Sequence, residues 1–259
     1  RYGLTKYLNE VKAEEASRAE KQLIENLSKA GQRIMGFCKS TFFKRMDSSG
    51  FAFLLTLKRH ILRNAIFLYA IDNKLNLPIG DENSLPDDFV EDEDANGMFD
   101  TDDENQDSDD LIIPTDMEYY EQKAKKHYEL LMQKNNVNWL NSKYFKRTLK
   151  QNLKKDCQCI IKMIQLCGQW KTKEDQKLNE LYKLVTETYP KDKIVLFTQY
   201  SDTAKYLCRQ LRKKNVEQID IATGDSKNTT SIVEHFSPVS NEKSYPADQQ
   251  SRILIATDV

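Results

Sequence analysis

The first part of the chain carries its apolar residues at helical spacing. Between residues 1 and 30 they recur every three or four positions with charged residues between them, which predicts an amphipathic helix. Gly31 is expected to break this helix, and residues 32–48 are expected to form a second one. A third helix is predicted over residues 51–71, where two adjacent apolar rows form a stripe wide enough to be buried against other helices.

Helical spacing returns further along the chain. It resumes near Asp116 and continues, with breaks, to about Trp170. Residues 172–189 predict one more helix, with Leu178 and Val185 on its apolar face.

After Pro190 the pattern changes from helical spacing to short apolar runs. Such continuous runs are typical of strands that helices cover on both faces, and they occupy residues 193–197, 218–222 and 252–256. Each run is followed by small polar residues. Ser201 or Asp202 is expected to cap the helix after the first run, and the helix after the second run is expected to begin at Thr229 or Thr230. This alternation predicts an α/β fold with a parallel sheet, incomplete at three strands, after a largely α-helical region. In such sheets ligands bind beyond the carboxyl ends of the strands.

Charge is distributed unevenly along the chain. Residues 75–122 contain 18 Asp or Glu and no Lys or Arg, although the whole chain has a net charge of only −1. The other residues hold all 39 basic and 22 of the 40 acidic residues, a net charge of +17. This excess fits a polyanionic partner, but lysine-rich helices with solvated surfaces would give the same count.

The acidic run falls in a segment that is poor in apolar residues. Pro and Gly are scattered through residues 76–116, and dense like charge opposes compaction, so a long and partly disordered loop is predicted. An alternative is that this loop mimics nucleic acid and masks the basic surface.

Cysteine usage and hydropathy bound the cellular setting. The five cysteines are an odd number, and one residue separates Cys157 from Cys159, where zinc sites have two to four. No metal site is therefore expected, and free thiols fit a reducing cytoplasm. No apolar run reaches the length of a membrane helix and the first residues resemble no secretory signal, so neither a membrane partner nor secretion is expected.

Three blocks in the last third of the chain resemble motifs of the C-terminal RecA-like lobe of superfamily-two helicases, in the same order. KIVLFTQYSDTAKYLCRQL resembles motif IV, ATGDSKNTTSIVEHFSP resembles the glycine-containing block after it, and RILIATDV resembles the beginning of motif V. The resemblance covers about residues 172–259. A further string, FFKRMDSSGFAFLLTL, is similar to an element in the interlobe helices of bacterial Snf-type and RapA-like translocases.

The resemblance implies a domain organisation and an activity. Residues 1–171 would be a helical interlobe or linker region, and residues 172–259 the start of the second lobe, ending within motif V. The full-length parent would be an ATP-dependent helicase or translocase that uses ATP and magnesium, with a DNA or RNA backbone and its own first RecA-like lobe as partners. No G-x-x-x-x-G-K-[ST] phosphate loop and no motif with an arginine finger is found, so this segment alone is expected to be inactive and to hold no cofactor.

The resemblance also names candidate site residues. Nucleic-acid backbone contacts are implied for Thr198, Gln199, Thr223, Gly224 and Thr257, and Asp258 would link these contacts to the ATP cleft. Hydroxyls and main-chain amides at strand ends bind phosphates without reading sequence, and a glycine lets the main chain approach closely. The alternative is that these threonines and Asp258 cap helices. An arginine that family members often carry after motif IV is absent, and Thr230 lies near its place.

Two other functional classes are alternatives to a helicase or translocase. A non-catalytic nucleic-acid or protein interaction module could retain a helicase-like lobe without the activity. A small-molecule enzyme of flavodoxin-like topology is disfavoured because no glycine-rich loop follows the first strand. His60, His127 and His235 lack an acid or nucleophile at a recognisable spacing, so no catalytic residue is assigned.

Overall fold

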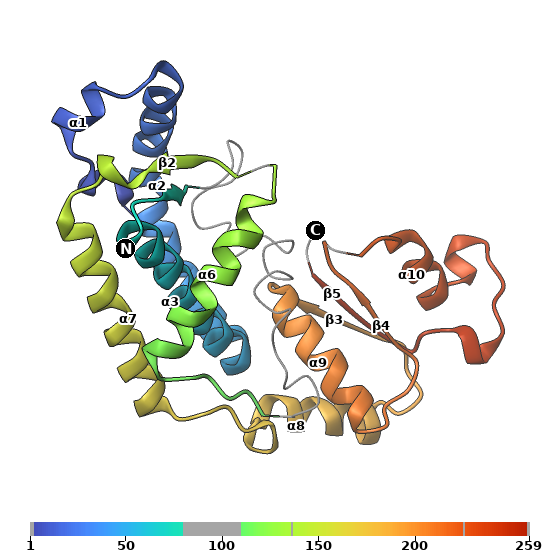
Figure 1. The fold of residues 1–259 in the computed structure, drawn as a ribbon. Coiled ribbons are helices and arrows are strands. Elements are labelled where there is room, and N and C mark those ends of the chain that lie inside the picture. Colours follow the sequence, from blue (N-terminus) through green and yellow to red (C-terminus); the bar gives the residue numbers. More distant parts are fainter. Residues whose placement is uncertain (1–2, 80–109, 136, 225, 258–259) are drawn as a thin grey trace. The chain divides into compact units, whose positions relative to one another are not determined.

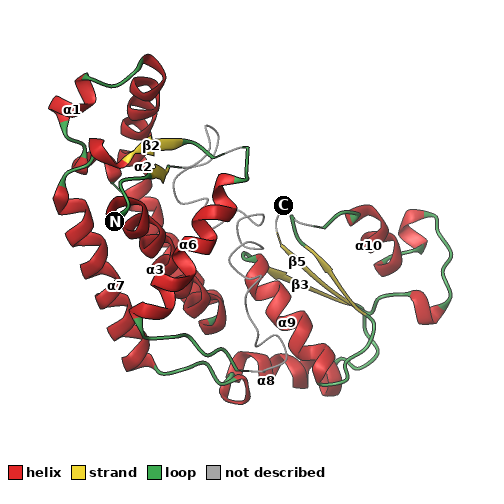
Figure 2. Ribbon diagram, in the orientation of Figure 1, coloured by secondary structure: helices red, strands yellow, loops and turns green. Residues whose placement is uncertain are grey.

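A computed structural model describes residues 3–79, 110–135, 137–224 and 226–257, and for residues 28–41 it describes the helical backbone only (Figures 1 and 2). The chain divides into two compact units. A helical unit comprises Arg1–Lys44, Phe53–Glu104 and Ile112–Gln169, and an α/β unit comprises Arg45–Ala52, Asn105–Leu111 and Trp170–Val259. Most of the predicted acidic loop and Asp258 lie outside the described residues.

Four long helices account for most of the helical unit. They are α2 (Arg18–Ser48), α3 (Gly50–Asp72), α6 (Met117–Met132) and α7 (Arg147–Cys167), and shorter elements precede them at η1 (Leu4–Tyr7), α1 (Glu10–Glu14) and η2 (Ser142–Tyr144). The predicted break at Gly31 is wrong, because α2 runs through it. A single glycine costs a helix only about 1 kcal/mol relative to alanine, which the flanking helix formers can offset.

Helix α2 begins with a reciprocal pair of hydrogen bonds. The Glu20 amide donates to Ser17 Oγ at 3.3 Å, and the Ser17 amide donates to Glu20 Oε2 at 2.9 Å, which is a capping box. The backbone hydrogen bond from Ser17 is the main cause that lowers the pKa of the Glu20 carboxyl, since it favours the charged form. The α2 start therefore has local stabilisation that does not depend on packing.

Helix α3 supplies the core of the helical unit. Leu57 and Ile61 are fully buried on it, and Leu54 and Leu62 nearby are buried as well, which confirms the predicted wide apolar stripe. Cys157 of α7 lies with its sulfur 4.0 Å from the Ile61 carbonyl oxygen, so α7 packs along the same core.

A two-stranded antiparallel sheet in the helical unit has no counterpart in the sequence predictions. Strand β1 (Asn76–Pro78) pairs with β2 (Trp139–Asn141), and Leu77 lies opposite Leu140, both fully buried. Tyr128 of α6 donates its hydroxyl proton to the Asn76 carbonyl at 2.9 Å. The first residues of the predicted loop 76–116 are therefore part of an ordered strand.

The α/β unit contains the predicted parallel sheet. Strands β3 (Ile194–Thr198), β4 (Ile219–Ala222) and β5 (Ile253–Thr257) lie in the order β3-β5-β4, with both pairs parallel. Its helices are η3 (Thr172–Glu174), α8 (Gln176–Lys183), a π-turn η4 (Leu184–Thr188), α9 (Ser201–Lys213) and α10 (Thr229–Phe236), followed by short turns η5 (Val239–Asn241) and η6 (Ala247–Gln249). The mixed α/β class is thus confirmed.

Helices α9 and α10 pack on opposite faces of this sheet. Ile232 and Phe236 of α10 contact Ala222, Leu254 and Ala256, while the alternate residues Ile253 and Ile255 face α9 and are fully buried. The expectation that all strands are covered on both faces is wrong for β3. Within the described residues, its Val195 and Phe197 remain exposed, because β3 is an edge strand and α10 packs over β4.

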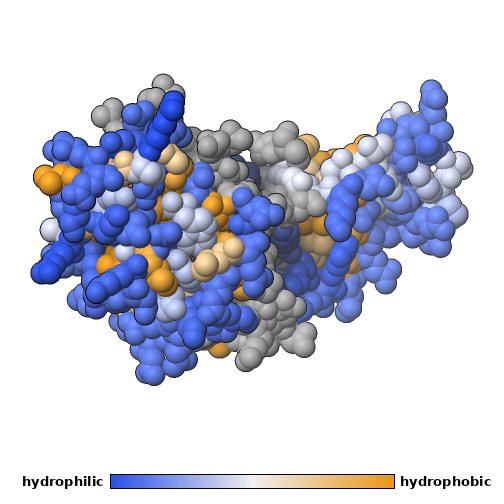
Figure 3. Space-filling view, turned by 45° about the horizontal axis from the view of Figure 1, so that its top comes forward, coloured by the Kyte–Doolittle hydropathy of each residue, from blue (hydrophilic) through white to orange (hydrophobic). Residues whose placement is uncertain are grey.

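The face of the molecule drawn in space-filling form is largely polar. In the space-filling view, hydrophilic residues cover most of the face shown and hydrophobic residues are scattered over it (Figure 3). None of the described helices combines the length and apolar character that a membrane crossing requires.

The described cysteines differ sharply in accessibility, which gives a labelling prediction. Cys157 and Cys208 are buried and burial raises their thiol pKa, that of Cys157 to about 11, whereas Cys159 and Cys167 are exposed. Because the thiolate is the reactive species, iodoacetamide at pH 8 should alkylate Cys159 and Cys167 at least tenfold faster than the buried pair. Mass spectrometry of native protein tests this, with urea-unfolded protein as control; equal native rates would contradict the burial.

Candidate nucleic-acid interface

The parallel register brings the ends of the three strands to one edge of the sheet. Thr198 of β3 lies beside Thr257 of β5, and Ala222 of β4 lies beside Ala256, so Thr223 follows next to Thr257. Gln199 and Gly224, the residues that leave β3 and β4, are exposed. We call this carboxyl end of the sheet the carboxyl edge, and the structure places there all five described candidates, residues 198, 199, 223, 224 and 257.

In the turn after β4, Thr223 is buried and Gly224 is exposed. The Thr223 amide donates to Ser226 Oγ at 2.9 Å, and the Ser226 amide donates back to the Thr223 carbonyl at 2.9 Å. This tight turn places Gly224 at the surface, where the absence of a Cβ leaves its main chain accessible.

Thr198 and Thr223 do not cap the helices that follow them. Helix α9 has Tyr200 at its N-cap with no side-chain hydrogen bond, and Asn228 caps α10 by accepting from the Ser231 amide at 3.1 Å. The expected caps of α9, Ser201 and Asp202, are therefore wrong, and so is the helix-cap alternative for these two threonines. Asp202, in the first turn of α9, instead forms an ion pair with a residue that is far from it in the sequence.

That residue is Arg45, at the C-terminal end of α2. Its Nη1 donates to Asp202 Oδ2 at 2.8 Å, with both side chains buried, and its guanidinium carbon lies 4.5 Å from the centre of the Tyr200 ring. Arg45 lies in the string that resembles the interlobe element, but the sequence predicted no role for it. The only available signal was an arginine at the end of an amphipathic helix, since its partner lies 157 positions away.

Arg45 belongs to a turn, residues 45–52, that packs wholly within the α/β unit. In this α2–α3 turn, Phe51 stacks on Tyr206 of α9 with ring centres 4.4 Å apart. Tyr206 in turn donates to Asp175 Oδ2 at 2.8 Å and accepts from Trp170 Nε1 at 3.2 Å. Burial is the main cause that raises the pKa of the Tyr206 hydroxyl, which therefore stays protonated and can serve as this donor.

The turn requires a glycine at position 50. A Cβ built there would lie 2.3 Å from Cζ3 of the Trp170 indole, whose nitrogen is held by Tyr206. Replacing Gly50 with Ala should therefore lower the free energy of unfolding of the α/β unit by about 1–3 kcal/mol through overpacking. Urea unfolding followed by fluorescence tests this, and a variant as stable as wild type would show that the indole moves freely.

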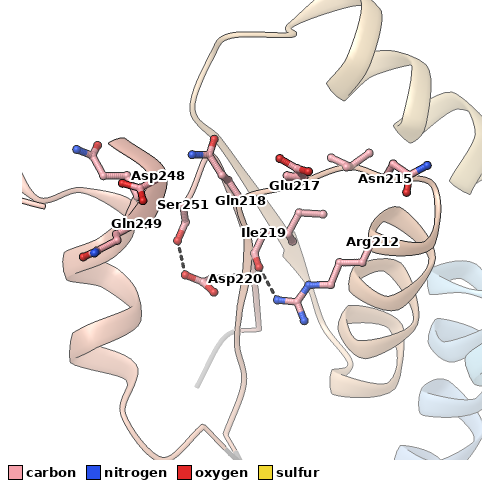
Figure 4. Close-up of a pocket in the computed structure, with 11 residues that line it drawn as sticks. Arg212, Asn215, Glu217, Gln218, Ile219, Asp220, Asp248, Gln249 and Ser251 are labelled. Atoms are coloured by element: carbon pink, nitrogen blue, oxygen red, sulfur yellow. Dashed lines mark hydrogen bonds between the residues drawn. The ribbon is translucent and has the colours of Figure 1, made fainter. Parts of the chain in front are cut away.

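The opposite, amino edge of the sheet carries an open cavity of about 540 Å³ (Figure 4). Two pairs of its lining groups contact each other: Arg212 donates to the Ile219 carbonyl at 2.6 Å, and Ser251 Oγ contacts the Asp220 carboxylate. None of the five described candidate residues lines this cavity. Across the described part of the chain no group of His, Cys, Asp and Glu is arranged to hold a metal ion, and Cys157 and Cys159 differ in exposure on α7.

Comparison of the chain with protein-family models, with curated proteins and with solved structures returned no match. The geometry of the α/β unit and the charge of the chain are therefore the basis for a function.

The excess of basic residues is confined to one part of the chain. Residues 172–259, which form the sheet and its helices, contain 13 basic and 13 acidic residues. The net charge of +17 outside the acidic segment therefore comes entirely from residues 1–74 and 123–171. Most of these residues belong to the helical unit. Helix α7 alone carries five Lys or Arg and one Asp.

Proposed function

We propose that this chain binds the sugar–phosphate backbone of nucleic acid at the carboxyl edge, as part of an ATP-dependent helicase or translocase. The observation that carries the proposal is the convergence of Thr198, Thr223–Gly224 and Thr257 on one edge of a parallel sheet. Small hydroxyls and exposed main chain at such an edge suit phosphate oxygens, and they carry no sequence information.

Charge supports a division of labour within this proposal. Residues 172–259, whose charges balance, offer hydrogen bonds but little attraction, whereas the basic residues within 1–74 and 123–171 supply the long-range field that draws in a polyanion. Binding should therefore be weak, independent of sequence and strongly dependent on salt. The four free thiols among the described cysteines support the further proposal of a reducing, cytoplasmic setting.

The parent protein would supply the ATP chemistry. Its first RecA-like lobe would hold ATP and magnesium, and Asp258, outside the described residues, would connect the carboxyl edge to that cleft. A parent that binds nucleic acid but shows no nucleic-acid-stimulated ATP hydrolysis would favour the non-catalytic interaction module.

Thr257→Val tests the proposal at one side chain, because it keeps the shape and removes the hydroxyl. Loss of a hydrogen bond to a charged acceptor typically costs about 1.5–3 kcal/mol, so affinity for labelled single-stranded DNA or RNA should fall about tenfold or more. Thr223→Val should have a smaller effect, because Thr223 is buried. Thr188→Val is the matched control, since Thr188 is exposed on the amino side of β3. Fluorescence anisotropy at low salt measures all three; wild-type affinity in Thr257→Val would contradict the proposed contact.

A further inference from the structure

The α2–α3 turn contacts the loop that leaves β3 at several points. The Ser48 hydroxyl lies 3.4 Å from Thr198 Oγ1 and 3.0 Å from Thr203 Oγ1, so it bridges the end of β3 and the first turn of α9. Between these two points run residues 198–202, which comprise the last residue of β3, two connecting residues and the first two residues of α9. We call this segment the exit loop, and it contains the candidate contacts Thr198 and Gln199. The α2–α3 turn therefore contacts the part of the carboxyl edge that β3 contributes.

Arg45 holds the other end of the same loop. It pairs with Asp202 at 2.8 Å and covers the ring of Tyr200 at 4.5 Å, so two of the five exit-loop residues contact one guanidinium. Asp202 also lies in the first turn of α9, where the positive end of the helix dipole favours a carboxylate. Arg45 lies in the last turn of α2, where a cation is favoured.

The turn itself is fixed by contacts that do not involve the exit loop. Phe51 stacks on Tyr206, Ser49 Oγ accepts from the Ala52 amide at 3.5 Å, and the Asp47 carbonyl accepts from the Lys177 ammonium. These anchors on α8 and α9 give Arg45 and Ser48 defined positions from which they can order a neighbouring loop.

We infer that Arg45 and Ser48 are positioning residues for nucleic-acid binding at the carboxyl edge: they hold the exit loop in its binding conformation and neutralise the Asp202 carboxylate beside it. The inference rests on the proposed function. Arg45 is buried, so it acts through the loop and does not contact phosphate. Without the Arg45 charge, the Asp202 carboxylate would repel incoming phosphates more strongly, and the loop would lose one of its contacts with the α2–α3 turn.

Two variants and a control separate positioning from direct contact. Arg45→Met removes the ion pair and the ring contact, Ser48→Ala removes only the bridging hydroxyl, and Lys183→Met breaks an exposed ion pair with Glu180 within α8. Hydrogen exchange of the amides of residues 198–202 reports loop order without any ligand. Anisotropy with fluorescein-labelled oligodeoxythymidine, repeated over a range of salt concentrations, reports affinity and the number of phosphates neutralised.

The expected result is faster exchange in the exit loop for Arg45→Met, by about tenfold or more, and a smaller increase for Ser48→Ala. Affinity should fall about tenfold or more for Arg45→Met and about fivefold for Ser48→Ala. The slope of log affinity against log salt should not change, whereas loss of a direct phosphate contact would reduce it by about 0.7 on a single strand. Lys183→Met should match wild type in loop exchange.

Three results would overturn the inference: unchanged loop exchange in both variants, faster exchange with unchanged affinity, or a reduced salt slope in Arg45→Met. If Arg45→Met does not fold, Ser48→Ala decides the question by the same readouts. If wild-type protein does not bind the oligonucleotide, the proposed function fails, and loop exchange still shows whether the turn orders the loop.

Discussion

Replacing Leu57 with Ala is expected to lower the free energy of unfolding of the helical unit by about 2–5 kcal/mol. Leu57 is fully buried in the apolar stripe of α3, so the truncation removes its transfer free energy and leaves a cavity that close-packed neighbours fill only in part. Leu166→Ala on α7 is the matched control, because Leu166 is almost fully exposed. Urea unfolding followed by circular dichroism measures both variants; equal stabilities would mean that α3 is not the core of this unit.

Replacing Arg45 with Met is expected to destabilise the α/β unit by about 3–5 kcal/mol, because it removes the cation from a buried ion pair with the Asp202 carboxylate. The double variant Arg45→Met/Asp202→Leu should recover much of this loss, since an apolar pair of similar size often replaces a buried ion pair without cost. Lys183→Met, which breaks an exposed pair, should leave stability unchanged.

The two tryptophans allow this second prediction to be read in one unit. Trp139 belongs to the helical unit and Trp170 to the α/β unit, so a Trp139→Phe background leaves Trp170 as the only indole reporter. Urea unfolding monitored at Trp170 then measures the unit that contains Arg45. A double variant no more stable than Arg45→Met would show that lost packing, and not the loss of the cation, causes the destabilisation.

Local pattern was sufficient for the main elements of the α/β unit. Short apolar runs with polar exits predicted β3, β4 and β5, and the helical stripes between them predicted α9 and α10 near their observed bounds. Each of Thr198, Thr223 and Thr257 lies at the end of one of these strands. Because parallel strands end at a common edge, a parallel sheet places the three threonines close together.

The features that the sequence did not predict depend on contacts between distant residues. Strands β1 and β2 have three residues each and pair across more than 60 positions, so neither has a periodicity of its own. The cap of α9 was misassigned because Asp202 is engaged by Arg45, a choice that only the tertiary structure reveals. The exposed side of β3 likewise depends on where α10 packs, which no local run of residues specifies.

A hydrogen-exchange footprint tests whether nucleic acid binds at the carboxyl edge, as proposed. Exchange is measured at low salt with and without a saturating single-stranded oligonucleotide of mixed sequence. If nucleic acid binds there, the amides of residues 198–199, 223–224 and 257 should exchange more slowly. Exchange around the amino-edge cavity near Asp220 and Ser251 should not change. An oligonucleotide that binds and protects only helical residues such as those of α7, with the carboxyl edge unchanged, would contradict the proposal.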